Sequence, residues 1–149
     1  MKDYDAQRDL NALLKGERMA VESYERFINA AGNEAVRNGL KDIQDGHRRN
    51  AEALAGRIQD LGGRPDFTTG VSGLIAGARL DVETKGMNDT LDILKKAYDG
   101  EDRRIAMVEE VMAGGLDEES RRLVVAILDR EHDHLHSMLS LMSEYGYRQ

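Results

Sequence analysis

The stretch from residue 123 to residue 141 repeats apolar residues at helical spacing and breaks this pattern near its middle. Its apolar stripe consists of Val124, Ile127, Met138 and Leu141. Glu131 and His134 fill stripe positions between them and, three residues apart, are neighbours on one helix face. That face is the one that a helix in a bundle buries. An ionised carboxylate in a core is very costly unless something pairs with it, and a metal ion is the simplest partner.

Three further stretches show the same pattern, one from about residue 5 to 31, one from about 34 to 61, and one from Asp89 to the glycines at 114 and 115. Their stripes are Leu10, Leu13, Leu14, Val21, Tyr24 and Ile28; Val36, Leu40, Ile43, Ala51, Leu54 and Ile58; and Leu91, Leu94, Tyr98, Ile105, Val108 and Met112. The polar interruptions are Glu17 in the first, His47 with Gln44 one turn earlier in the second, and Glu101 in the third. The four stripes predict an all-α protein with a single domain over residues 1–149.

Glycine and its neighbours predict where the helices end. Gly32 and Asn33 are expected to close the first helix in the left-handed conformation of a C-cap, and Gly62-Gly63 followed by Pro65 to close the second. Asp117 and two glutamates are expected to begin the last helix. Residues 62–88 then form a long crossover, and apolar spacing from Val71 to Val82 predicts a short helix within it.

The interruptions lie near the middle of all four helices. If each pair of successive helices packs as an antiparallel hairpin, a rise of roughly 1.5 Å per residue brings the four interruptions to one level of the bundle. A glycine precedes three of the polar positions: Gly16, Gly46 and Gly100. Because a mid-helix glycine costs roughly 1 kcal/mol relative to alanine, these glycines indicate either a need for space at this level or incidental placement.

Composition excludes several classes of function. The 149 residues contain no cysteine, which rules out disulfides, thiolate zinc sites and iron–sulfur clusters. The formal net charge of -7 argues against nucleic acid as a partner. The N-terminus leads into no signal-type apolar run and no apolar stretch has the length of a membrane span, so we expect a cytoplasmic protein without a membrane partner.

These motifs resemble the ferritin-like superfamily of di-iron carboxylate four-helix bundles, including bacterioferritin and rubrerythrin domains and small bacterial ferritin-like families. Glu17 with Tyr24 seven residues later is similar to the first helix of that superfamily, Glu101 to its third, and Glu131 with His134 to the Glu-x-x-His pair of its fourth. The resemblance implies a bundle with a long crossover between its second and third helices. It also implies metal binding by Glu17, Gln44, His47, Glu101, Glu131 and His134.

The chain departs from that superfamily at Gln44, where the second helix would carry a bridging glutamate. An amide oxygen is a weaker ligand than a carboxylate for a hard or borderline cation, so the sequence leaves open whether the site holds one ion or two. By resemblance the metal is iron, with manganese or zinc as alternatives, and the chemistry is oxidation of iron(II) by dioxygen or peroxide in iron handling or stress response. A non-enzymatic helical bundle acting as a stress or interaction module, with a metal-free polar core, is the competing hypothesis. Homodimer formation is also left open.

Overall fold

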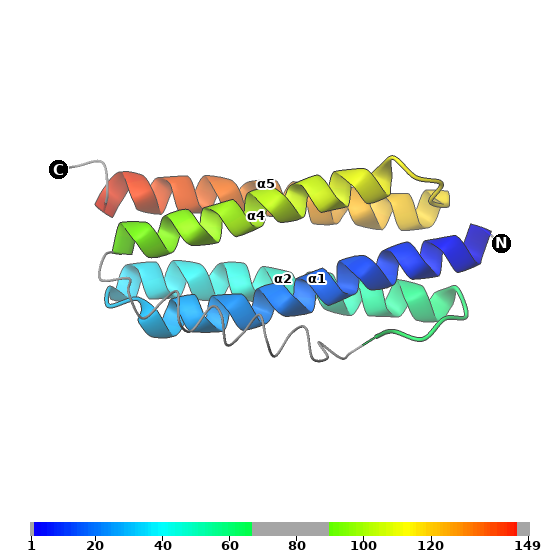
Figure 1. Ribbon diagram of the computed structural model, residues 1–149, viewed down its shortest axis with the longest axis horizontal. Coiled ribbons are helices and arrows are strands. Elements are labelled where there is room, and N and C mark those ends of the chain that lie inside the picture. Colours follow the sequence, from blue (N-terminus) through cyan, green and yellow to red (C-terminus); the bar gives the residue numbers. More distant parts are fainter. Residues whose placement is uncertain (1, 67–89, 146–149) are drawn as a thin grey trace.

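The computed structural model describes residues 2–66 and 90–145, which form four long helices running side by side (Figure 1). The helices are α1 (Lys2–Ala30), α2 (Glu34–Asp60), α4 (Thr90–Met112) and α5 (Glu118–Tyr145). Successive helices pack as the antiparallel hairpins α1–α2 and α4–α5, and α2 and α5, like α1 and α4, are also neighbours. The expected all-α four-helix bundle is therefore confirmed, and the described residues contain no strand.

The bounds of the helices agree with the sequence prediction to within a few residues. The short helix predicted between Val71 and Val82 lies outside the described residues. The helix α2 ends and α4 begins at opposite ends of the bundle, the arrangement that a long crossover produces (Figure 1). Gly62 closes α2 with a φ of 82°, and the Gly62 and Gly63 amides donate to Gln59 O and Ile58 O, both at 2.9 Å. These two bonds are the Schellman arrangement that a glycine with positive φ allows.

The turn between α1 and α2 differs from the prediction. Asn33 is not a left-handed C-cap of α1, since its backbone is extended with φ of -97° and ψ of 128°, and no glycine there has a positive φ. It is instead the N-cap of α2, where its side-chain oxygen accepts from the Val36 amide at 3.1 Å. An N-cap residue requires an extended backbone to aim its side chain at the first turn, which explains why the left-handed conformation is absent.

The core consists of two apolar clusters, one toward each end of the bundle. One cluster includes Tyr24, Phe27, Ile28, Val36, Leu40, Ile43, Leu94, Met138 and Met142, and the other includes Leu10, Leu13, Leu14, Leu54, Ile58, Val108, Val124 and Ile127. The predicted stripes supply most of both clusters, because burial of apolar surface is what orients each helix. Between the clusters the helices contribute polar side chains, and this layer holds the candidate site.

Arg57 joins the end of α2 to the start of α5. Its guanidinium donates to Asp117 Oδ2 at 2.7 Å and to Ser120 Oγ at 2.9 Å, while the Ser120 amide donates to the same Asp117 oxygen at 3.1 Å. Asp117 is therefore an N-cap of α5 and the partner of a cation from α2. Over the part of the chain that the structure describes, no helix combines the length and the apolar character needed to cross a membrane.

Candidate metal centre

Five of the six predicted site residues meet in the polar layer at mid-height of the bundle. Glu17 comes from α1, His47 from α2, Glu101 from α4, and Glu131 and His134 from α5. Four of them are no more than 1% exposed, and His134 is 7% exposed. Antiparallel packing of the hairpins brings the interruptions to one level, as the positions along the helices predict.

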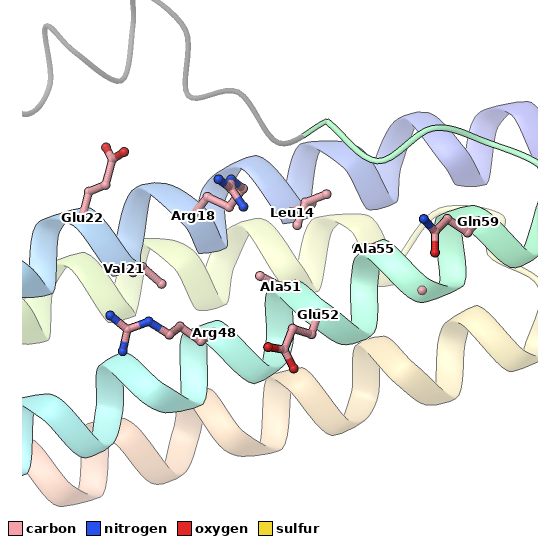
Figure 2. A pocket seen from close by; sticks show the side chains of 10 residues that line it. Leu14, Arg18, Val21, Glu22, Arg48, Ala51, Glu52, Ala55 and Gln59 are labelled. Carbon is pink, nitrogen blue, oxygen red and sulfur yellow. The ribbon is translucent and has the colours of Figure 1, made fainter.

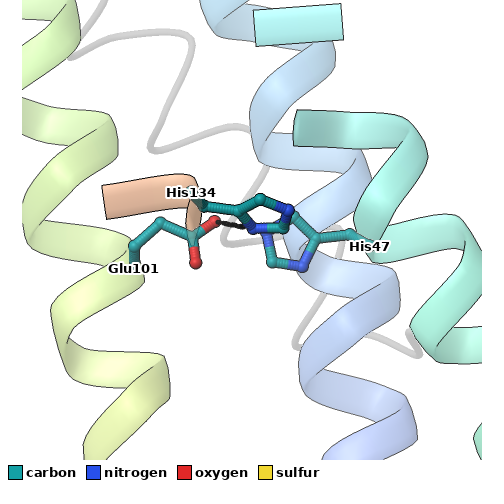
Figure 3. Close-up of side chains that lie close together, drawn as sticks. All are labelled: His47, Glu101 and His134. Atoms are coloured by element: carbon teal, nitrogen blue, oxygen red, sulfur yellow. Dashed lines mark hydrogen bonds and ion pairs between the residues drawn. The ribbon is translucent and has the colours of Figure 1, made fainter. Parts of the chain in front are cut away.

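His47 lies between two carboxylates from different helices. Its Nδ1 is 2.5 Å from Oε2 of Glu17, and its Nε2 forms a short hydrogen bond with Oε1 of Glu101. The same Nδ1 is 4.0 Å from Oε1 of Glu131. His134 approaches from α5, with its Nδ1 3.5 Å from Oε1 of Glu101 (Figure 3). One imidazole ring therefore connects the carboxylates of α1 and α4 across the core.

Several buried ligand-type atoms in this layer have no hydrogen-bond partner among the described residues. They are both carboxylate oxygens of Glu131, Oε2 of Glu101 and Nδ1 of His134. Leaving one buried acceptor unpaired costs about 1–3 kcal/mol, so four at one level are unusual unless another group satisfies them. Imidazole nitrogens and carboxylate oxygens are ligands that iron, manganese and zinc accept, so this donor set fits a metal ion.

The ligand-type atoms fall into two overlapping groups. His47, Glu101 and His134 form one, and Glu17, His47 and Glu131 form the other, with the ligand atoms of each group within 4.8 Å of one another. His47 belongs to both groups. A single histidine therefore has to serve whichever group binds an ion.

The three carboxyl groups of the layer differ in pKa. Burial raises the pKa of Glu17 to about 7. Burial, and then the neighbouring Glu17 carboxyl, raises the pKa of Glu131 to about 10. Burial also acts to raise the pKa of Glu101, but the neighbouring His134 and His47 imidazoles outweigh it and hold that pKa well below its usual range. Without a cation, the layer thus carries a proton on Glu131 and a full charge on Glu101.

Gln44, the sixth predicted residue, directs its amide nitrogen to acceptors on α1. Its side chain is buried, and its amide nitrogen donates to the Val21 carbonyl at 2.9 Å and to Oε2 of Glu25 at 3.0 Å. Both acceptors belong to α1, the helix with which α2 forms the first hairpin. The amide nitrogen is therefore used in helix packing, and the carboxylate and imidazole groups of the cluster number three and two.

One polar residue that the sequence did not single out, Asn50, completes the layer. Asn50 is fully buried one turn after His47; its Nδ2 lies 3.4 Å from Oε1 of Glu17, and its Oδ1 accepts from Arg130 at 2.7 Å. The signal was present in the sequence, because a residue three positions after His47 shares its helix face. Tyr24, which the resemblance pairs with Glu17, donates its hydroxyl to Oε1 of Glu101 at 2.7 Å.

The three glycines beside the predicted site differ in what surrounds them. A Cβ on Gly46 would lie 2.5 Å from Nε2 of His134, so this glycine gives the imidazole room against α2. A Cβ on Gly16 would lie 2.9 Å from the methyl group of Met107, the end of a flexible side chain. No atom of the described residues lies within 4 Å of a Cβ on Gly100. The need for space is thus strict at Gly46 and absent at Gly100.

The bundle and its buried layer of glutamate and histidine define a ferritin-like four-helix protein, and comparison with known proteins agrees. The chain belongs to the family described as a domain of unknown function, DUF2383, whose model matches residues 5–114. No curated protein matches the chain.

Two solved structures are similar in fold. One is a two-domain protein from Anabaena variabilis with DJ-1/ThiJ/PfpI-like and ferritin-like domains; it is 17% identical with a TM-score of 0.80, and the match covers 100% of this chain but 39% of that one. The other is a dodecameric thioferritin, a bacterioferritin-related protein from Bacteroides fragilis; it is 19% identical with a TM-score of 0.78, covering 97% of this chain and 88% of that one. At these identities the likeness establishes the ferritin-like fold.

Proposed function

We propose that the chain is a metal-binding protein of the ferritin-like class that holds iron in its bundle core. Glu17, Glu101 and Glu131 would supply carboxylate oxygens, and His47 and His134 would supply imidazole nitrogens. The observation that carries this proposal is Glu131, whose two oxygens are both buried and without a partner among the described residues. A carboxyl group in that position holds a proton or binds a cation, and a bound cation would also satisfy Glu101 and His134.

The geometry favours one tightly bound ion per chain. Both groups of ligand atoms depend on His47, and the amide nitrogen of Gln44 donates to α1. Binding of two ions would require both nitrogens of His47 to be free of protons. It would also set two divalent cations against three carboxylates, which leaves positive charge uncompensated in the core. Manganese and zinc accept the same nitrogen and oxygen ligands, so metal competition decides the identity of the ion.

Bound iron would supply one-electron exchange with dioxygen or peroxide, and we propose oxidation of iron(II) in iron handling or oxidative stress as the reaction. The protein's own contribution would be to hold three carboxylates and two imidazoles in a dry layer. Tyr24 would fix the orientation of Glu101 through its 2.7 Å hydrogen bond. The apolar clusters on both sides of the layer would exclude water from it.

Metal analysis of protein purified without chelator tests this proposal. We expect metal in the wild type, and its loss in Glu131→Ala and in His134→Ala with helical content unchanged by circular dichroism. Glu144→Ala, a carboxylate removed from the same helix outside the cluster, is the matched control and should retain metal. Wild-type metal content in both site variants would remove these residues from the centre.

A metal-free polar core is the second candidate function, that of a helical stress or interaction module. It is favoured by the continuous chain of contacts that joins Tyr24, Glu101, His47, Glu17, Asn50 and Arg130 without any ion. In that case the wild type would bind no metal, and truncation of Glu131 would change only stability. Titration of the chelator-treated protein with iron(II) under anaerobic conditions distinguishes the two.

The setting of this function is also a proposal. We propose that residues 1–149 act as one domain, in the cytoplasm, where iron(II) and the oxidant would meet it. Assembly into a homodimer or larger oligomer is proposed from the likeness in fold to the dodecameric thioferritin. Light scattering at several protein concentrations would measure that assembly.

A further inference from the structure

Arg130 of α5 reaches across to α2 beside the candidate metal centre. It directly precedes Glu131 in the sequence, and its guanidinium donates to Oδ1 of Asn50 at 2.7 Å. Its side chain passes beside Gly46, since Cδ of Arg130 lies 3.4 Å from the position that a Cβ would take there, one helical turn before Asn50. Arg130 is half-buried and forms no ion pair with a carboxylate of the described residues. The charge of this arginine is therefore directed at a buried amide.

Asn50 connects Arg130 to a proposed ligand. Its side chain has 0% exposure, its Oδ1 accepts from Arg130, and its Nδ2 lies 3.4 Å from Oε1 of Glu17. The other oxygen of Glu17, Oε2, lies 2.5 Å from Nδ1 of His47. The two oxygens of Glu17 thus have different neighbours, because one faces the Asn50 amide and the other faces the ligand cluster.

Arg130 determines which end of the Asn50 amide faces Glu17. A guanidinium only donates hydrogen bonds, and an ionised carboxylate only accepts them. With the amide oxygen toward Arg130 and the amide nitrogen toward Glu17, both contacts join a donor to an acceptor. Rotation of the amide by half a turn would set donor against donor and acceptor against acceptor, so both contacts would be lost. An arginine that does not touch Glu17 thereby acts on it.

An apolar side chain at residue 50 would be the simpler solution for packing. Ile43 and Leu54 are buried on the same face of α2, one on either side of the polar layer, and a leucine between them would continue the apolar stripe. A buried amide instead loses its hydration and has to find partners in the protein. The residues that hydrogen-bond a metal ligand fix its orientation, and this role accounts for a buried asparagine beside Glu17.

Arg48 serves for comparison, because it also adjoins a proposed ligand, His47, in the sequence. It lines a groove of about 640 Å³ between α1 and α2 (Figure 2). Its guanidinium pairs with Asp45 of the same helix at 2.8 Å, and the two side chains are 49% and 54% exposed. An arginine next to a ligand in the sequence therefore need not act on the centre. Arg130 differs in that its hydrogen bond reaches a buried amide of another helix.

We propose that Arg130 and Asn50 are positioning residues for Glu17. Asn50 holds one oxygen of Glu17, so that the other is presented to the centre, and Arg130 holds Asn50 in the orientation that this contact needs. The inference rests on the proposed function, because it takes Glu17 to be a metal ligand. Arg130 cannot itself be a ligand, since a guanidinium has no free electron pair to offer a cation.

The metal affinity of Arg130→Met distinguishes positioning from simple electrostatics. A positive charge near a bound cation opposes binding, so removal of the charge alone would strengthen it. Removal of a contact that holds a metal ligand weakens binding, typically by roughly 10- to 100-fold. We expect Arg130→Met to bind cobalt(II) about tenfold more weakly than the wild type in competition with a chelator. Arg48→Met, which removes an arginine of an exposed pair, is the matched control and should bind as the wild type does.

Asn50→Leu and the double variant test whether Arg130 acts through Asn50. We expect Asn50→Leu to lose about tenfold in cobalt(II) affinity, and the addition of Arg130→Met to cause no further loss, because the contact between the two is already absent. The visible absorption of bound cobalt(II) reports the arrangement of its ligands. It should change in these variants and stay unchanged in Arg48→Met, whereas a merely structural role would lower stability without altering the spectrum. Circular dichroism confirms that the variants are folded.

The outcomes separate this inference from the proposed function. A wild type that binds neither cobalt(II) nor iron(II) would overturn the proposed function and the positioning role with it. If the wild type binds metal and Arg130→Met binds it equally or more tightly, only the positioning role is overturned. Losses of affinity that multiply in the double variant would show that Arg130 acts on the centre by a route other than Asn50, which also contradicts the inference.

Discussion

His134 lies directly against the backbone of α2 at Gly46, where a Cβ would be 2.5 Å from the imidazole Nε2. The two helices can approach this closely only because residue 46 has no side chain. His134 is thereby held with its Nδ1 facing Glu101, 3.5 Å away. A residue that is not itself a ligand thus determines where a proposed ligand lies.

Gly46→Ala should displace His134 and weaken metal binding. The substitution favours the helix by up to about 1 kcal/mol through intrinsic propensity, so a loss of affinity would come from the collision and not from helix disruption. Gly56→Ala in the same helix meets no described atom and is the control, with unchanged metal affinity. Competition titration with a metal chelator measures both. Equal affinity in the two variants would show that His134 can move without consequence.

The stability of the metal-free protein should fall as the pH rises. Burial raises the pKa of Glu17 to about 7 and that of Glu131 to about 10, from an unfolded value of 4.5. The folded state therefore keeps protons that the unfolded state has already lost. The associated stability is complete below pH 4.5, and it declines up to about pH 7 for Glu17 and about pH 10 for Glu131.

Urea unfolding of wild type and Glu131→Gln across this pH range checks that expectation. Above pH 7 the remaining decline belongs to Glu131, so Glu131→Gln, which has no proton to lose, should show a flatter profile there. Glu118→Gln, at an exposed carboxylate, should follow the wild type. Added metal should restore the wild-type stability at high pH, since a ligand that binds only the folded state shifts the equilibrium toward it. If the free energy of unfolding of wild type and Glu131→Gln declined in parallel above pH 7, Glu131 would not be the group that loses its proton there.

The positions along the helices were enough to predict which residues share a level. Glu17, His47, Glu101, Glu131 and His134 each interrupt an apolar stripe, and a stripe fixes both the buried face and the height along a helix. Geometry of this kind follows from the helical repeat and short hairpin turns, so it is readable from sequence. The same reasoning identified the apolar clusters.

The orientation of a side chain at the edge of an apolar stripe could not be predicted from the sequence. Gln44 is buried, as its position predicts, but its amide turns to the Val21 carbonyl and Glu25, partners that only the packed α1–α2 pair provides. The sequence likewise could not show that Gly46 faces an imidazole while Gly100 faces open space. These differences depend on which neighbouring side chain lies opposite, and that is a property of the tertiary structure.

Arg57→Ala should destabilise the bundle by about 1–3 kcal/mol, because the largely buried guanidinium is a shared partner of Asp117 and Ser120. Its loss would leave a cap of α5 without its partner from α2. Arg122→Ala removes an exposed arginine paired with Glu118 within α5 and should cost less than about 0.5 kcal/mol. Chemical denaturation compares the two, and equal effects would show that the α2–α5 contact adds nothing to stability.

The Gln44→Glu substitution distinguishes what the resemblance predicts for residue 44 from what the structure predicts. The resemblance alone predicts that a glutamate at this position would complete the carboxylate set and raise metal stoichiometry toward two ions per chain. The structure predicts a different result, since a carboxylate there cannot donate to the Val21 carbonyl and would face the Glu25 carboxylate. Two lost donations and a repulsion should cost about 1–3 kcal/mol, with metal stoichiometry unchanged.

Gln44→Met, which removes the donations without adding charge, is the matched variant for that experiment. Both variants should lose stability, with the larger loss in Gln44→Glu, and both should keep the wild-type stoichiometry in an anaerobic iron(II) titration. Stoichiometry near two in Gln44→Glu alone would mean that the glutamate leaves α1 and reaches the cluster. The gain from binding a second cation would then exceed the cost of breaking the α1–α2 contact, and residue 44 would be a determinant of how many ions the centre holds.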